Sequence, residues 1–169
     1  MRSVIAVYVE NKYGVLTRVS GLFMRRGFNI DSLTVGETDD PDYSRITVTM
    51  RGDENVREQL INQLKKLHNV KQVKLLEDDS SVERELMLLK VVNTPETRSE
   101  ILAATEVYRG KIIDYTTNAM CVEVTGEPSK IKAFIEVMKP LGIIEMCRTG
   151  VVALARGGGS MLEQPDTNE

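Results

Sequence analysis

Residues 3–10 read Ser-Val-Ile-Ala-Val-Tyr-Val-Glu, a run of β-branched and apolar side chains that predicts a buried strand. Residues 11–14, Asn-Lys-Tyr-Gly, form a loop. Apolar side chains then recur at helical spacing from Val15 until Gly27, where a helix can end. This strand–loop–helix order is the start of a longer pattern.

The rest of the first half continues that pattern. Strands are expected at residues 30–35, 43–51 and 70–76, and Asp53 is expected to cap a second helix that precedes the last of them. Residues 1–77 therefore read βαββαβ. Two helices that cover one face of a four-stranded antiparallel sheet form the ferredoxin-like arrangement.

The same order returns in the second half. Residues 78–83 are acidic and polar and predict a linker. Strands are expected at 86–92, 111–115, 119–125 and 143–155, with helices that open at Thr94-Pro95-Glu96 and at Pro128. The predicted fold class is α+β, with two ferredoxin-like βαββαβ domains at 1–77 and 84–157. Residues 158–169 predict a flexible tail.

Composition excludes several classes of protein. The 169 residues carry 22 Lys and Arg against 25 Asp and Glu, a formal net charge of −3. That balance argues against a nucleic-acid partner, which usually meets a basic face. No apolar run approaches the ~20 residues of a membrane helix, and the first residues lack a signal-peptide layout. A cytoplasmic protein without a membrane partner is expected.

The inventory of reactive side chains is small. The sequence holds one histidine, His68, and two cysteines, Cys121 and Cys147, so a four-ligand zinc site is excluded and a disulfide framework is not expected. Both cysteines lie in predicted strands and are expected to be buried. The acidic run at 39–42 is interpreted as a turn rather than a cation site.

Motifs for catalysis are missing. Neither G-x-x-x-x-G-K-[S/T] nor G-x-G-x-x-G occurs, and no nucleophile–base pair stands out. We therefore expect no catalytic residue, no metal ligand and no cofactor in this chain.

The loop at 11–14 has features of a ligand site. Free N–H groups where the first helix begins, from Gly14 through Val15 to Leu16, favour a carboxylate, and Gly14 lets a ligand approach the backbone. Asn11 offers a donor and an acceptor. Carbonyls at Asn29-Ile30 can take an ammonium group from a neighbouring molecule. These groups suit a free amino acid with an apolar tail, although a glycine before a helix also fits plain turn chemistry.

Several stretches carry a family resemblance. The βαββαβ order with a glycine at the first strand–helix junction resembles the ACT domain, a small-molecule regulatory module. Together the stretches resemble the regulatory (small) subunits of acetolactate synthase over residues 1–157. These stretches are residues 10–16, 26–33, 38–41 with 44–45, 82–85, 108–114 and 148–154.

The resemblance implies a function. In this family a separate catalytic subunit uses thiamine diphosphate, magnesium and FAD to start branched-chain amino acid synthesis. The small subunit activates it and confers feedback inhibition, usually by valine. ACT domains form a homodimer with the effector between them. Carried over, the effector-binding residues are Asn11, Gly14, Val15 and Leu16 of one protomer with Asn29 and Ile30 of the other.

Two other functions stay open at this point. One is a stand-alone ACT-type amino-acid sensor without a catalytic partner. The other is an acylphosphatase-like enzyme, which would need an arginine and an asparagine arranged around a phosphate. Arg18 follows the loop that holds Asn11.

Overall fold

The computed structural model describes residues 1–162 and divides the chain into two compact units. The first unit comprises Met1–Val82 together with the segment that starts at Val151. The second unit comprises Glu83–Gly150. Both are antiparallel sheets with helices in βαββαβ order, which confirms the predicted fold class.

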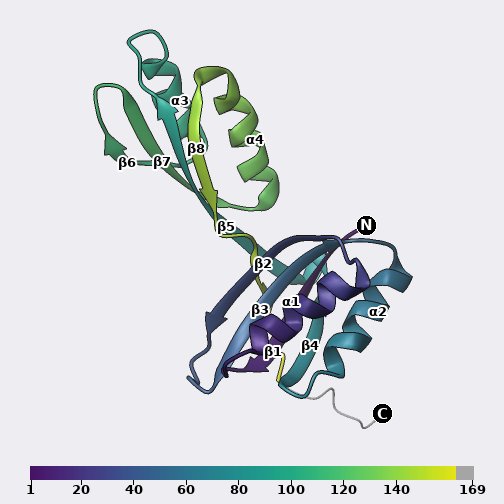
Figure 1. Cartoon of the computed structure of the whole chain (residues 1–169). Helices are drawn as coiled ribbons and strands as arrows, with labels where there is room; N and C mark the ends of the chain where they lie inside the picture. Colours follow the sequence, from purple (N-terminus) through teal and green to yellow (C-terminus); the bar gives the residue numbers. More distant parts are fainter. Residues whose placement is uncertain (163–169) are drawn as a thin grey trace. The chain divides into compact units, whose positions relative to one another are not determined.

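The first unit is built around its first strand. The elements are β1 (Arg2–Glu10), α1 (Val15–Arg26), β2 (Ile30–Glu37), β3 (Tyr43–Arg51), α2 (Glu54–Lys65) and β4 (Val70–Leu76). The sheet order is β2-β3-β1-β4, so β1 is central and β2 is an edge strand. Helices α1 and α2 cover one face (Figure 1), where Ile5 and Val7 are fully buried. Asp53 caps α2 as predicted, accepting a 2.9 Å bond from the Val56 N–H.

The second unit repeats this plan. The elements are β5 (Ser81–Val92), α3 (Arg98–Val107), β6 (Lys111–Tyr115), β7 (Ala119–Gly126), α4 (Pro128–Met138) and β8 (Ile143–Arg148). The sheet order is β6-β7-β5-β8, and the core lies between the sheet and the two helices. Cys121 is half-buried, but Cys147 is exposed. The expectation that both cysteines are buried is wrong because β8 is an edge strand with little covering it.

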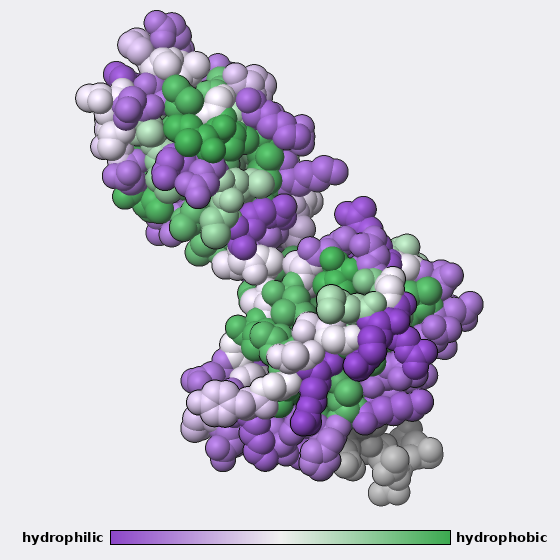
Figure 2. Space-filling view, viewed as in Figure 1, coloured by the Kyte–Doolittle hydropathy of each residue, from purple (hydrophilic) through white to green (hydrophobic). Residues whose placement is uncertain are grey.

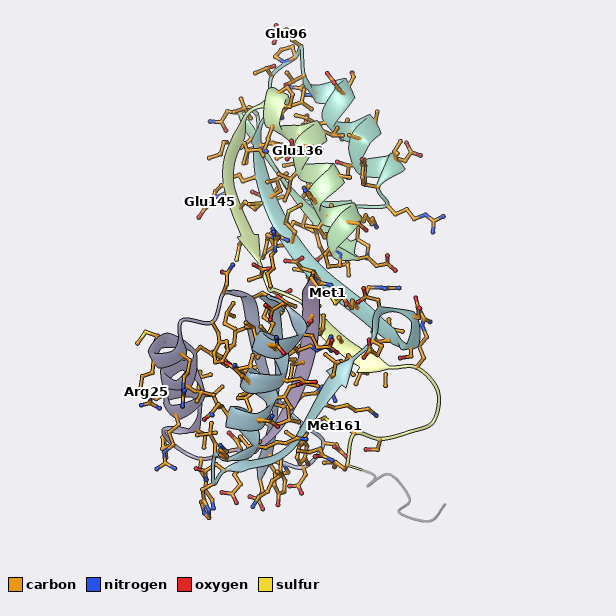
Figure 3. All side chains as sticks on the ribbon, turned by 90° about the vertical axis from the view of Figure 1, so that its right-hand side faces the viewer. Met1, Arg25, Glu96, Glu136, Glu145 and Met161 are labelled. Atoms are coloured by element: carbon orange, nitrogen blue, oxygen red, sulfur yellow. The ribbon has the colours of Figure 1, made fainter. Side chains whose placement is uncertain are left out.

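A second apolar layer covers the other face of the first sheet. Residues 151–161, here called the strap, include the short strand β9 (Val152–Ala155), which pairs with β5. Figure 3 shows Met161 on the side of this sheet opposite to Arg25 of α1. Three strap residues are buried in one cluster with residues of β1 and β4. That cluster comprises Val4, Ala6, Tyr8, Leu76, Val151, Ala153 and Met161.

Polar contacts fix the strap to the sheet. The half-buried Arg45 of β3 donates from Nη2 to the Ala153 carbonyl at 2.7 Å and from Nη1 to the Met161 Sδ at 3.1 Å. Burial lowers the pKa of its guanidinium. The Ser32 hydroxyl accepts a bond from the Val151 N–H at 3.4 Å. Because a half-buried arginine needs partners, these bonds attach the strap to the first unit.

The strap corrects three predicted boundaries. Residues 78–83 are not all linker, since only the short 3-10 turn Asp78–Ser80 precedes β5, and Ser81 is buried. The predicted last strand, 143–155, is interrupted where Gly150 adopts a φ of 80°. Residues after that break pack with the first unit rather than with a domain that runs to 157.

The predicted flexible tail also begins too early. Met161 is 8% exposed and packed, so residues 158–161 belong to the strap. Residues 163–169 lie outside the described part of the chain. Within residues 1–162, no helix has the length and apolar character needed to cross a membrane.

A charge placed under the strap should loosen the first unit. Ala153 is 5% exposed and Leu154, its neighbour, is 61% exposed. We expect Ala153→Asp to destabilise this unit by about 3 kcal/mol, because it places a charged side chain in the apolar layer between the strap and the sheet. Leu154→Asp should change stability by less than about 0.5 kcal/mol. Hydrogen exchange of the β1 amides measures both, and equal exchange in the two variants would contradict the strap packing.

Candidate functional site

The loop between β1 and α1 has the backbone that the sequence predicted. Gly14 precedes α1 with a φ of 79°, in the left-handed region that favours glycine. A Cβ built on Gly14 would meet no atom within 4 Å. The space beside the helix start is therefore open, and a small ligand can reach the backbone there.

The first N–H groups of α1 face this space without strong internal partners. The Val15 N–H donates to the Lys12 carbonyl at 3.3 Å, whereas across residues 1–162 the Gly14 and Leu16 N–H groups have no backbone acceptor. No acidic side chain occupies the first turn. The helix start therefore offers donors and a partial positive charge to an anion.

The two apolar residues of the site differ in role. The Val15 side chain is 5% exposed and belongs to the core, so only its backbone is available to a ligand. Leu16 is 46% exposed, although it continues an apolar helical pattern. Its side chain can contact the apolar tail of a ligand whose carboxylate lies at the helix start.

The donor groups of Asn11 already make hydrogen bonds within the chain. Its Nδ2 donates to the Pro41 carbonyl at 3.0 Å and to the Glu37 Oε1 at 3.2 Å, and its backbone N–H donates to the Asp42 carbonyl at 2.7 Å. These contacts fix the loop against the end of β2. The donor capacity expected for a ligand is therefore used internally, and Oδ1 is the group that Asn11 can offer, as an acceptor for an ammonium.

Asn29 and Ile30 lie at the other end of α1. That helix has 12 residues, so its ends are about 18 Å apart. Within one chain, the structure therefore does not bring Asn29 and Ile30 close to the other predicted effector-binding residues at 11–16. Asn29 is exposed and its carbonyl accepts a bond from the Arg51 N–H at 3.2 Å, while Ile30 is half-buried beside the core.

A charged network that the sequence did not reveal surrounds the start of the loop. Glu10, the last residue of β1, binds Lys71 Nζ at 2.7 Å and Lys12 Nζ at 3.0 Å. Asn69 Nδ2 donates to its Oε2 at 2.7 Å. The bond from Lys71 is the main reason why the pKa of Glu10 falls to about 2, with Lys12 and Asn69 adding to it. Asn69 and Lys71 are about sixty residues from Glu10 in the sequence, and no local pattern indicates that they meet it.

Other candidate chemistry finds no support in the described residues. Residues 1–162 contain no group of three or more His, Cys, Asp or Glu side chains able to hold a metal ion. Asp40 Oδ1 accepts a bond from the Asp42 N–H at 3.0 Å, which fits the turn interpretation of 39–42. Arg18 donates to Asn69 Oδ1 at 2.6 Å and Asn11 binds the 37–42 segment, so they do not form the arginine–asparagine cradle of a phosphatase.

A ferredoxin-like sheet with an open helix start at its first loop defines the class of ACT regulatory domains. Residues 5–72 match a family model described as "AHAS small subunit-like ACT domain". Residues 84–157 match a family model described as "Small subunit of acetolactate synthase". The chain belongs to the family of acetolactate synthase small subunits.

Individual relatives agree with this assignment. The chain is 51% identical to a probable acetolactate synthase small subunit of Archaeoglobus fulgidus, over 93% of this chain and 98% of the relative. It is 46% identical to the small subunit of Bacillus subtilis, over 93% and 92%. The crystal structure of the Thermotoga maritima small subunit has a TM-score of 0.87 at 39% identity, covering 94% of this chain and 99% of that one.

The lowered pKa of Glu10 predicts acid sensitivity. Because the folded state favours the carboxylate, this interaction contributes its full stability above pH 4.5, the ordinary pKa, and loses it as the pH falls towards about 2. We expect carbon-13 NMR to show a Glu10 titration midpoint near 2. Lys71→Met should raise it, whereas Lys74→Met, on the same strand, should not. A wild-type midpoint near 4.5 would contradict the network.

Proposed function

We propose that this chain is a regulatory subunit that activates the catalytic subunit of acetolactate synthase and confers feedback inhibition by valine. The observation that carries the proposal is the open helix start at Gly14, beside the exposed Leu16 and the acceptor of Asn11. A carboxylate, an apolar tail and an ammonium group are the parts of valine that these three features would bind.

The edge strand β2 supports a two-chain site. Asn29 and Ile30 lie at the start of β2, and Asn11 contacts Glu37 at its end. If two copies pair β2 with β2 in antiparallel fashion, the start of one strand lies beside the end of the other. Asn29 and Ile30 of one copy would then approach the Gly14 loop of its partner, and each homodimer would have two valine sites. An unpaired edge strand is a ready surface for such pairing.

The second unit is proposed to contact the catalytic subunit. Its edge strand β8 carries Ile144 at 52% and Met146 at 43% exposure, and Figure 2 shows apolar surface (green) on the viewed face of this unit. Exposed apolar residues are typical of interaction surfaces. Thiamine diphosphate, magnesium and FAD are proposed to bind the catalytic subunit, and this chain is proposed to have no catalytic residue of its own.

Gly14→Asp should abolish feedback inhibition and leave activation intact. The new side chain fits the open space, and aspartate tolerates a positive φ better than most residues. Its carboxylate would occupy the helix start and repel that of valine. Loss of one charge-assisted hydrogen bond alone weakens affinity about tenfold to a hundredfold. Valine inhibition and rate enhancement of the reconstituted complex measure the two effects.

Gly157→Asp is the matched control. Gly157 has a φ of 82° and equally open surroundings, but it lies in the strap. Inhibition of this variant should match the wild type. If Gly14→Asp folds and is inhibited at the same valine concentration as the control, the effector site lies elsewhere.

Mixed dimers test whether two chains build each site. Asn29→His should block the side of the site that the partner chain supplies. Homodimers of Gly14→Asp and of Asn29→His should therefore both lose valine binding. A dimer with one copy of each carries one site with both defects and one intact site. Calorimetry on co-expressed mixed dimers should therefore recover one valine site per dimer. If the mixed dimer has no valine site, Gly14 and Asn29 act in the same site of a single chain.

A further inference from the structure

Asn69 bonds the two segments that flank the loop at residues 11–14, namely the end of β1 and the first turns of α1. It lies between α2 and β4 and is 8% exposed. Its Nδ2 donates to Glu10 Oε2 at 2.7 Å, and its carbonyl accepts a bond from the Glu10 N–H at 2.9 Å. Its Oδ1 accepts a bond from Arg18 Nη1 at 2.6 Å. Glu10 is the residue before the loop, and Arg18 lies in the first turns of α1.

The first residue of the loop is held separately, because the side chain and the backbone N–H of Asn11 bond the 37–42 segment. The Lys12 N–H donates to the Glu10 carbonyl at 3.0 Å, and the Val15 N–H bonds the Lys12 carbonyl at 3.3 Å. Tyr13 is fully exposed and Gly14 has no side chain. Asn69 bonds both the end of β1 and α1, so together with the Asn11 bonds it fixes the distance between these two elements. A buried asparagine with both amide atoms bonded is rigid, because each partner would leave a buried polar group unpaired if it moved.

We propose that Asn69 is a positioning residue for the effector site: by bonding Glu10 and Arg18 it holds the start of α1 at the place where the effector carboxylate binds. This inference rests on the proposed function, since it assumes that the effector binds at Gly14. It extends that function to a residue that does not touch the effector. Preorganised donors bind more tightly because the ligand does not have to order them.

Asn69→Ala tests the proposal against a matched control. In the second unit Asn93 is 3% exposed, donates from Nδ2 to the Thr116 carbonyl at 2.6 Å and accepts from Arg98 Nε at 2.9 Å. Asn93→Ala therefore removes a similar set of bonds far from the loop in sequence. We expect calorimetry with valine to show about tenfold weaker binding for Asn69→Ala and unchanged binding for Asn93→Ala.

Two substitutions of Glu10 test the same proposal if Asn69→Ala fails to fold. Gln at position 10 still offers an amide oxygen to Asn69 Nδ2, whereas Ala does not. Both lose the carboxylate that binds Lys71 and Lys12, so both should be less stable. Valine affinity should stay within about twofold of the wild type in Glu10→Gln and fall about tenfold in Glu10→Ala.

The outcomes separate the two proposals. If Asn69→Ala binds valine as well as the wild type and Asn93→Ala do, Asn69 has only a structural role and the inference is overturned. The same conclusion holds if the two Glu10 variants lose valine affinity equally. If the wild type binds no valine, the proposed function itself fails and the inference fails with it.

Discussion

A central strand that is apolar on both faces is the constraint on which the first unit depends. Val4, Ile5, Ala6 and Val7 of β1 are all fully buried. Successive side chains of a strand point to opposite faces, so burying all four requires a layer on each side of the sheet. The helices supply one layer and the strap supplies the other. The order of the sheet, the place of the first loop and the return of the chain after residue 150 are all compatible with that requirement.

Much of this fold could be predicted from the sequence. Alternation in 43–51, helical spacing from Val15 and capping by Asp53 are local signals, and each agrees with the structure. The strap could not be predicted in the same way. Residues 152–155 read as the end of one long strand, because the break depends on a positive φ at Gly150 and the packing depends on a sheet face formed about a hundred residues earlier. Composition also misled at Ser81, where polar residues suggested a linker although the hydroxyl is buried.

The candidate site shows the same division. Gly14 and the helix start are local signals, although the pattern alone also fitted plain turn chemistry, and the structure has the positive φ that favours glycine there. The internal bonds of Asn11 join segments about thirty residues apart. The bonds of Glu10 to Asn69 and Lys71 join segments about sixty residues apart. Sequence reasoning on a single chain identifies residues able to bind a ligand. It does not show which of their donors are already occupied, and that decides what each can offer.

The strap has a consequence for the order in which the parts of the protein fold during synthesis. Arg45 bonds a carbonyl 108 residues later in the chain, and Ser32 bonds an amide 119 residues later. Contacts of such long sequence separation are slow to form, because a long loop must close before they contribute. During synthesis the first sheet can pair its strands and acquire its helices while its other face still exposes Val4, Ala6 and Tyr8. That face stays uncovered until Met161 has left the ribosome, so the regulatory half of the molecule is the first to begin folding and the last to finish.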